Sequence, residues 1–194
     1  MSPARARPGG GTAWAQAWIE PRVEDPEAVS ALGIARAHLA GGAALAGLRR
    51  LRLVELRGEL PERAALEELL HRSTAFYNPH KERCRVRLAR RERGPAEPGE
   101  ALVRVLEPGG ERRAPAERWW RQETGRDAEV REGRVWIVRA EAGADALACA
   151  RALGELVDRR HGLLWNPHAE DGAIAGGDAV PLPWLERNGG TEDA

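Results

Sequence analysis

The segment Phe76-Tyr77-Asn78-Pro79-His80-Lys81-Glu82 decides how this chain is interpreted, because a close copy returns as Leu164-Trp165-Asn166-Pro167-His168-Ala169-Glu170. Asn78 and Asn166 are 88 positions apart. A strand-like stretch returns at nearly the same interval, as Trp18-Ile19-Glu20-Pro21 and Val105-Leu106-Glu107-Pro108. This interval is longer than the roughly 20–45 residues of a solenoid repeat. We therefore expect one small domain that occurs twice in tandem.

The first copy predicts helices placed between strands. The alternation of Trp14, Gln16 and Trp18 with smaller apolar residues predicts a strand that ends at Pro21. Asp25-Pro26-Glu27 predicts a helix start, because Asp is a good cap and Pro suits the first helical position. Three further elements are expected: a half-exposed strand over 48–56, a helix from Pro61 to a stop at Asn78-Pro79, and a closing strand over 84–88.

The second copy repeats this order less clearly. Its expected elements are a strand over 101–106, a helix over 114–124, a strand or hairpin over 128–140 broken near Glu132-Gly133, a helix over about 144–164 and a weak strand over 173–175.

Each copy therefore predicts a β-α-β(-β)-α-β unit of the α+β class. Strands that are polar on one side favour an antiparallel sheet with helices on one face. We expect the copies, residues 13–90 and 101–176, to form two such sheets that cover each other as a pseudo-dimer within one chain. Residues 1–12, 91–100 and 177–194 are expected to be a flexible lead, linker and tail, because they are rich in Pro, Gly and charge.

Composition excludes several classes of protein. The 194 residues include 30 basic and 30 acidic side chains, so there is no general attraction to nucleic acid or anionic membrane. No apolar run approaches the roughly 18 residues needed to cross a bilayer, and the N-terminus lacks the apolar core of a secretory signal. Two cysteines are too few for a disulfide scaffold. A cytoplasmic protein is expected.

The Asn-Pro-His segments have two interpretations. Asn78 and Asn166 could present amides to a ligand, while His80 and His168 bind it or shuttle protons. Alternatively, Asn-Pro forms a turn that stops a helix, with the Asn side chain satisfying backbone groups. We favour the turn, because its chemistry alone explains the Asn-Pro pair. The bulky pairs before each Asn, Phe76-Tyr77 and Leu164-Trp165, are expected to anchor the turns in the core.

Motifs for catalysis or cofactor binding are missing from the sequence. Cys84 and Cys149 have neither metal-ligand spacing nor a basic helix-start context. No phosphate-binding loop, dinucleotide fingerprint or nucleophile elbow occurs. We expect no metal, no cofactor and no catalytic residue, which favours a scaffold or bridging protein.

Three of these segments resemble the PurS family, the small subunit of phosphoribosylformylglycinamidine synthase. Glu20-Pro21-Arg22-Val23-Glu24-Asp25-Pro26 resembles the family's opening Pro-Gly-Val-x-Asp-Pro segment, and the two Asn-Pro segments resemble its closing Leu-Leu-x-Asn-Pro-x-x-Glu. Two departures stand out: His80 and His168 replace an apolar residue, and Pro108-Gly109-Gly110-Glu111 has lost the Asp-Pro.

The resemblance implies a fused PurS dimer, similar to the dimer-like N-terminal region of the large single-chain synthases. Such a subunit would bridge a synthetase (PurL-like) and a glutaminase (PurQ-like) subunit and help ammonia pass between them, as part of an ATP- and glutamine-dependent ligase. No nucleic-acid or membrane partner is implied, and further self-association stays open. The residues implied as structural-turn or partner-contact candidates are Asp25, Pro26, Asn78, Pro79, His80, Glu82, Asn166, Pro167, His168 and Glu170.

Two alternatives remain open at this point. One is a ferredoxin-like regulatory or small-ligand-binding module that is not tied to purine synthesis. The other is a diverged stand-alone enzyme, which we favour least because the sequence shows no nucleophile, metal set or phosphate loop.

Overall fold

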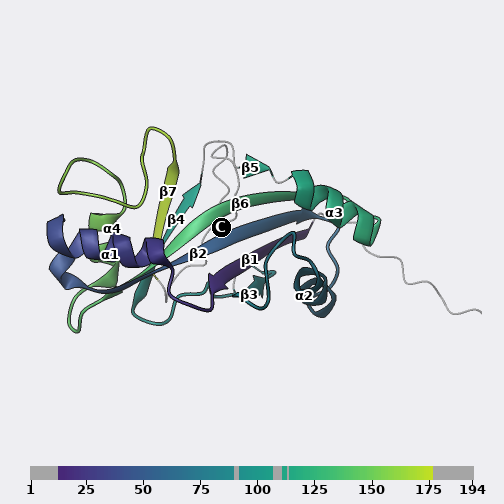
Figure 1. The fold of residues 1–194 in the computed structure, drawn as a ribbon, viewed down its shortest axis with the longest axis horizontal. Helices are drawn as coiled ribbons and strands as arrows, with labels where there is room; N and C mark the ends of the chain where they lie inside the picture. Colours follow the sequence, from purple (N-terminus) through teal and green to yellow (C-terminus); the bar gives the residue numbers. More distant parts are fainter. Residues whose placement is uncertain (1–12, 90–91, 107–110, 113, 177–194) are drawn as a thin grey trace, which may run out of the picture.

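The protein folds around one open antiparallel β-sheet (Figure 1). The computed structural model describes residues 13–89, 92–106, 111–112 and 114–176. Six main strands follow the order β3-β1-β2-β6-β4-β7, and the short β5 pairs with β6. The α+β class is confirmed. The expectation of two sheets that cover each other is wrong, because the strands of the two halves join edge to edge where β2 pairs with β6.

The described elements alternate strands with helices. In chain order they are β1 (Ala13–Pro21), α1 (Pro26–His38), the 3-10 helix η1 (Gly42–Ala44), β2 (Leu45–Gly58), α2 (Arg63–Arg72), β3 (Glu82–Arg87), β4 (Glu100–Leu106), β5 (Glu111–Arg112), α3 (Ala114–Thr124), β6 (Ala128–Ala140), α4 (Ala146–Leu153) and β7 (Asp171–Gly176). Apart from η1 and β5, the order of elements in 13–87 recurs in 100–176.

The two long central strands are covered on both faces. Leu48 and Val54 of β2 are buried under the helices, whereas Leu51 and Leu53 are buried on the opposite face. Ala96, between β3 and β4, belongs to the cluster on that opposite face. The expected half-exposed strand is therefore wrong: β2 is an inner strand with apolar neighbours above and below it. The expected break in β6 is absent too, since the register with β2 runs unbroken through Glu132 and Gly133.

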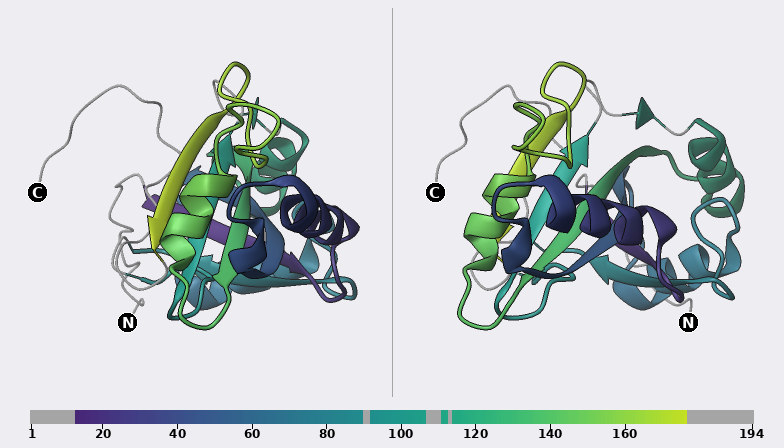
Figure 2. Two further views of the ribbon diagram at one scale, coloured as in Figure 1. Left: turned by 90° about the vertical axis from the view of Figure 1, so that its left-hand side faces the viewer. Right: turned by 60° about the vertical axis from the view of Figure 1, so that its left-hand side comes forward.

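The helices cover one face of the sheet in two separate pairs (Figures 1 and 2). At one end, α1 and α4 pack on a cluster that also contains Leu45, Val103 and Trp136. At the other end, α2 and α3 pack on a cluster with Ile19 and Val130. Each cluster thus takes one helix from 13–89 and the other from 92–176. Each cluster therefore combines residues of both halves.

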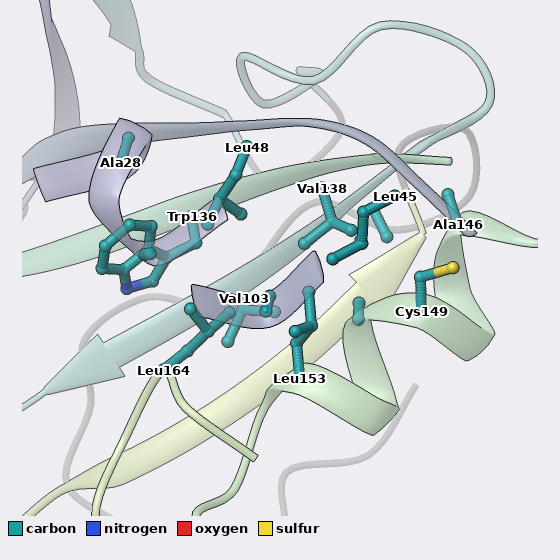
Figure 3. Close-up of a cluster of buried hydrophobic side chains, with 14 of the residues drawn as sticks. Ala28, Leu45, Leu48, Val103, Trp136, Val138, Ala146, Cys149, Leu153 and Leu164 are labelled. Atoms are coloured by element: carbon teal, nitrogen blue, oxygen red, sulfur yellow. The ribbon is translucent and has the colours of Figure 1, made fainter. Parts of the chain in front are cut away.

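The cluster under α1 and α4 shows this mixing in detail (Figure 3). Ala28 of α1 and Leu48 of β2 lie with Trp136 of β6 and Leu153 of α4, and all four side chains are buried. Removing such apolar surface from water stabilises the fold by roughly 25 cal/mol per Å². Part of this free energy comes from contacts between the two halves.

Several helix boundaries differ from those expected. The start of α1 is confirmed, because Asp25 caps it and Pro26 is its first residue. However, α2 ends at Arg72 and α4 at Leu153, well before Asn78 and Asn166. At Gly154 a side chain would collide with the Trp165 ring, since a Cβ there would lie 2.4 Å from it. Tertiary packing therefore ends α4 where local periodicity would continue it. The expected lead and tail lie outside the described residues.

Candidate functional site: two matched turns on paired arginines

The two Asn-Pro segments form turns with the same hydrogen bonds. In the first, the Asn78 side-chain oxygen accepts from the amide of His80 at 3.0 Å, and the Asn78 carbonyl accepts from the amide of Glu82 at 2.8 Å. In the second, Asn166 accepts from His168 at 3.0 Å and from Glu170 at 2.8 Å in the same way. The predicted use of the Asn side chains to bond backbone groups is confirmed, whereas their predicted position at a helix end is wrong.

A glutamate closes each turn. The Glu82 carboxylate accepts from the amide of Asn78 at 2.7 Å, and the Glu170 carboxylate accepts from the amide of Asn166 at 2.9 Å. This reciprocal arrangement resembles a capping box, in which a side chain at each end satisfies a backbone donor at the other. The glutamate of each Asn-Pro segment therefore closes its turn, and its distance from the Asn in the sequence suits this role.

The second oxygen of each glutamate points to an arginine. Glu82 Oε1 lies 3.6 Å from Arg52 Nη2, and Glu170 Oε1 accepts a hydrogen bond from Arg134 Nη2. Arg52 and Arg134 are direct register partners on β2 and β6. Two turns that are far apart in the sequence thus meet at one pair of arginines in the middle of the sheet.

These arginines lie on the helix-covered face, between the two helix pairs. Arg52 alternates with Leu51 and Leu53, which face the other way, and its register places Arg134 on the same face. Both side chains are 33% exposed, so the centre of this face is charged and reaches solvent. Arg52 also donates to Glu132 at 3.2 Å and to the Phe76 carbonyl at 2.5 Å. Partly exposed pairs of this kind contribute at most about 1 kcal/mol each.

The first turn is tied to the loop between β1 and α1. Arg22 donates through Nε to the Pro79 carbonyl at 3.1 Å and through its amide to the Lys81 carbonyl at 2.8 Å. Three residues later, Asp25 accepts from the Glu27 amide at 2.9 Å and from Arg50 Nε at 2.7 Å. The sequence-predicted residues of the first copy therefore belong to one connected polar region.

Asp25 is ionised by this arrangement. Partial burial by itself would raise its pKa, but hydrogen bonds from Arg50 and from the Glu27 amide outweigh the burial and leave the pKa below the usual value. Arg50 also lies over the Trp136 ring, 5.9 Å from its centroid. Asp25 therefore ties the start of α1 to β2 through Arg50, and Arg50 in turn contacts Trp136 on the neighbouring strand β6.

The histidines and the bulky residues of the motif face opposite ways. His80 and His168 are exposed, as expected for surface positions. Phe76 is buried under α3, edge-on to Trp119 at a centroid distance of 5.5 Å. Leu164 is buried in the cluster under α1 and α4. The predicted role of the bulky pairs as core anchors is confirmed, and each turn is held firmly while it presents a histidine to solvent.

Arg22, Arg52 and Arg134 are the residues that the sequence analysis missed. Each stands beside acidic or apolar neighbours in a strand or loop, and such positions usually face solvent. Nothing local indicates that Arg52 and Arg134 meet across a strand pair, because this depends on the register of β2 against β6. The recurrence of an Arg in both strands is the one available signal, and it is weak in a chain with 30 basic residues.

A concave region is lined by the β1–α1 loop, including Arg22 and Asp25. This cavity of about 470 Å³ runs between α1, the start of β2 and the end of β6. Arg49 crosses it, bound to Glu20 at 2.6 Å and to Glu100 at 3.0 Å. Val29 and Leu32 of α1 and Arg139 of β6 also line it. A small molecule with polar and apolar parts would fit such a lining.

The cysteines are poor nucleophiles in this fold. Burial raises the pKa of Cys84 to about 12 and also raises the pKa of Cys149. Both thiols therefore stay protonated near neutral pH. Within the described ranges, no group of three or more His, Cys, Asp or Glu side chains could hold a metal ion, and no helix is long and apolar enough to cross a membrane.

Comparisons with known proteins found no match: no family model, no curated protein and no solved structure matches the chain.

Proposed function

We propose that the chain is an internally duplicated, non-catalytic subunit similar to PurS, which acts in the cytoplasm within phosphoribosylformylglycinamidine synthase. In this role it bridges a synthetase subunit and a glutaminase subunit and helps ammonia pass between them. The complex converts formylglycinamide ribonucleotide to its amidine with ATP and glutamine. The chain needs no cofactor of its own for this task.

One observation carries the proposal: the same turn, bound to an arginine by the same glutamate, occurs twice, and the two arginines are register partners. Arg52 and Arg134 would lie at a twofold axis that relates 13–89 to 92–176. The strand order β3-β1-β2-β6-β4-β7 fits that axis, because it reads the same from both ends when β1 matches β4, β2 matches β6 and β3 matches β7.

The presence of one helix from each half in each cluster supports the same view. A twofold axis between β2 and β6 relates α1 to α3 and α2 to α4, and so relates the α1–α4 cluster to the α3–α2 cluster. Such a relation would be expected of a dimer whose subunits had been joined into one chain. The resemblance of Asp25-Pro26 and of both Asn-Pro-x-x-Glu segments to PurS then suggests which family of dimers was joined.

A bridging role needs two recognition surfaces held at a fixed distance. The two turns would provide them, since each is anchored by buried residues and exposes a histidine. A single sheet that carries both turns cannot change their separation without breaking the β2–β6 pairing. The partners would therefore be held in one relative orientation.

The test is a reconstitution with synthetase and glutaminase subunits from the same source. Glutamine-dependent amidine formation should need the chain, whereas ammonia-dependent formation by the synthetase should not. His80→Ala together with His168→Ala should weaken co-elution with the partners, while His161→Ala, at an exposed histidine outside the turns, should not. Full glutamine-dependent activity without the chain would disprove the proposal.

A regulatory or ligand-binding module is the alternative, and the cavity beside α1 is the observation that favours it. In that case a small metabolite should raise the melting temperature of the wild-type protein. Arg139→Ala, on the wall of the cavity, should remove this effect without lowering the melting temperature of the protein alone. A positive result, combined with no binding to synthetase or glutaminase, would favour the alternative.

A further inference from the structure

A second cavity, of about 400 Å³, lies on the sheet face that carries no helices. Its lining comes from β1, β2 and β3, and from Glu97 in the connection between β3 and β4. Trp18 and Leu51 contribute to it and belong to the buried apolar cluster of this face, so part of the lining is apolar. Volumes of this order are typical of sites that bind small molecules.

Arg83 and Arg85 line this cavity from β3, the strand at one edge of the sheet (Figure 1). Cys84 and Val86 of β3 pack against the cluster under α2 and α3, so the alternating arginines lie on the opposite face. Both arginines are exposed, and neither forms an ion pair with a described residue. Within the same ranges Arg83 has no side-chain hydrogen bond, and Arg85 donates only to the Pro95 carbonyl, at 3.0 Å. Two neighbouring guanidinium groups are therefore not neutralised by carboxylates.

The acidic side chains of the cavity do not serve as their partners. Glu20 is the register partner of Arg83, but its carboxylate binds Arg49 at 2.6 Å. Arg49 is itself shared with a second glutamate at 3.0 Å. Glu97 is exposed at the cavity and forms no ion pair with any residue of the described ranges. The two β3 arginines thus carry the positive charge of the cavity that the chain does not already use.

Trp18 is a third donor in the lining of this cavity. Its side chain is 2% exposed, and its indole N–H has no acceptor among the described residues. Trp18 and Arg85 are register partners on β1 and β3, so this donor lies beside the arginines. Trp120 and Trp136 also have indole N–H groups without an acceptor in the same ranges, but neither lines the cavity. A buried donor without an acceptor is unfavourable, and a ligand oxygen would satisfy it.

Strand β7 shows that the sheet does not need these arginines. Like β3, it follows an Asn-Pro turn and pairs antiparallel with the strand beside it. The first and third residues after the turn-closing glutamate are Arg83 and Arg85 in β3, but Asp171 and Ala173 in β7. The two arginines are therefore specific to one half of the chain, which favours a role in binding over a role in the fold.

We propose that Arg83, Arg85 and the indole N–H of Trp18 bind a phosphate group in this cavity. Two guanidinium groups favour a dianion over a single carboxylate, and their planar sets of N–H donors match phosphate oxygens. The indole N–H donates to a further oxygen of the same group. This chemistry is shared by free phosphate and by small phosphate monoesters. The inference does not depend on the proposed role in purine synthesis, because no residue of the Asn-Pro turns takes part.

A phosphate titration of the full chain, followed by the indole N–H resonances in ¹H–¹⁵N NMR spectra, tests the proposal. At about pH 8, where phosphate is a dianion, and at constant ionic strength, inorganic phosphate should shift the Trp18 resonance with a Kd of about 1 mM. That resonance is assigned with a Trp18→Phe protein. Arg83→Ala combined with Arg85→Ala should raise the Kd at least about tenfold, because hydrogen bonds between charged groups are lost. Both arginines are exposed, so the double variant should keep the melting temperature of the wild type.

Arg118→Ala on α3 is the matched control, because it removes the same charge from an exposed position on the helix-covered face. It should leave the Kd within about twofold of the wild-type value, since distant exposed charges are screened by salt. Glu97→Gln, which removes a negative charge from the cavity, should lower the Kd. Glycerol 3-phosphate separates the two sources of the group: tighter binding than inorganic phosphate assigns the site to a monoester, and weaker binding assigns it to the free ion.

Four results would overturn the proposal. They are a Trp18 resonance that does not move up to about 20 mM phosphate, a wild-type Kd in the double arginine variant, an equal loss of affinity in Arg118→Ala, and acetate that binds as tightly as phosphate.

Discussion

At the scale of the residue, Arg52 shows why the centre of the helix face is charged. Its guanidinium holds Glu132 through Nη1 and faces both Glu82 and the Phe76 carbonyl through Nη2, which a lysine could not do in one fixed geometry. Arg134, on the neighbouring strand, donates a hydrogen bond to Glu170. The arginines thus connect the middle of the sheet to the turns that enter β3 and β7.

The Asn side chains of the turns should stabilise the fold directly. Asn166→Ala removes the acceptor for the His168 amide, so we expect the free energy of unfolding to fall by about 0.5–2 kcal/mol, the cost of a lost cap. His168→Ala is the control and should change it by less than about 0.5 kcal/mol, because the ring is exposed. Urea denaturation measures both values. Equal losses in the two variants would contradict the assigned role of Asn166.

Asp25 should make stability depend on acid pH. Its pKa is lower in the folded protein than in the unfolded chain, so its contribution is fully present above about pH 5 and is lost as pH falls through the folded pKa. Asp25→Asn keeps a good helix cap but loses the charge that binds Arg50. We expect the variant to be less stable than wild type at pH 7, by up to about 1 kcal/mol, and equally stable near pH 2. Denaturation at both pH values checks this.

At the scale of the element, glycines in β7 and after α4 let the second half close around Trp165. A Cβ at Gly172 would lie 2.2 Å from the Trp165 ring. The ring therefore lies directly on the strand backbone, and together with Gly154 it ends α4 early. The expected helix over 144–164 is wrong for this reason. The apolar residues at the end of that range belong to a segment that folds back onto the sheet.

Strand β7 offers a pair of matched substitutions. Gly172→Ala should cost about 1–3 kcal/mol of unfolding free energy, because Trp165 must move out of a packed position. Gly176→Ala, in the same strand with no atom within 4 Å of the added Cβ, should cost less than about 0.5 kcal/mol. Thermal unfolding followed by tryptophan fluorescence compares them. If both variants unfold like wild type, Trp165 is not packed against β7.

At the scale of the whole molecule, the sheet joins the two halves, and helices of different halves pack side by side on it. The α1–α4 and α2–α3 clusters each need residues from both sides of the 88–99 connection. A half of the chain could form its own three strands, but its two helices would lose the side chains that the other half contributes to each cluster. Small domains have little stability to lose in this way.

Cutting the chain between Gly94 and Pro95 should therefore give two fragments that do not fold alone. Each should lack a cooperative thermal transition by circular dichroism, and mixing them at equal concentration should restore one, because the β2–β6 pairing and both clusters can then form. An uncut chain treated identically is the control. Cooperative unfolding of either fragment by itself would show that the halves are independent domains.

The sequence alone was enough to predict the local features of this protein. It determined most of the strands, the Asp25-Pro26 start of α1, the buried Phe76-Tyr77 and Leu164-Trp165 pairs, and the recurrence of the Asn-Pro turns. These depend on alternation, capping and turn chemistry, which act between residues a few positions apart. Three features depend on tertiary packing and could not be predicted: β2 pairs with β6, helices of different halves lie side by side, and Arg52 meets Arg134. Alternating residues give the same pattern whether two sheets stack or join at their edges, so the choice rests on packing between segments far apart in the chain.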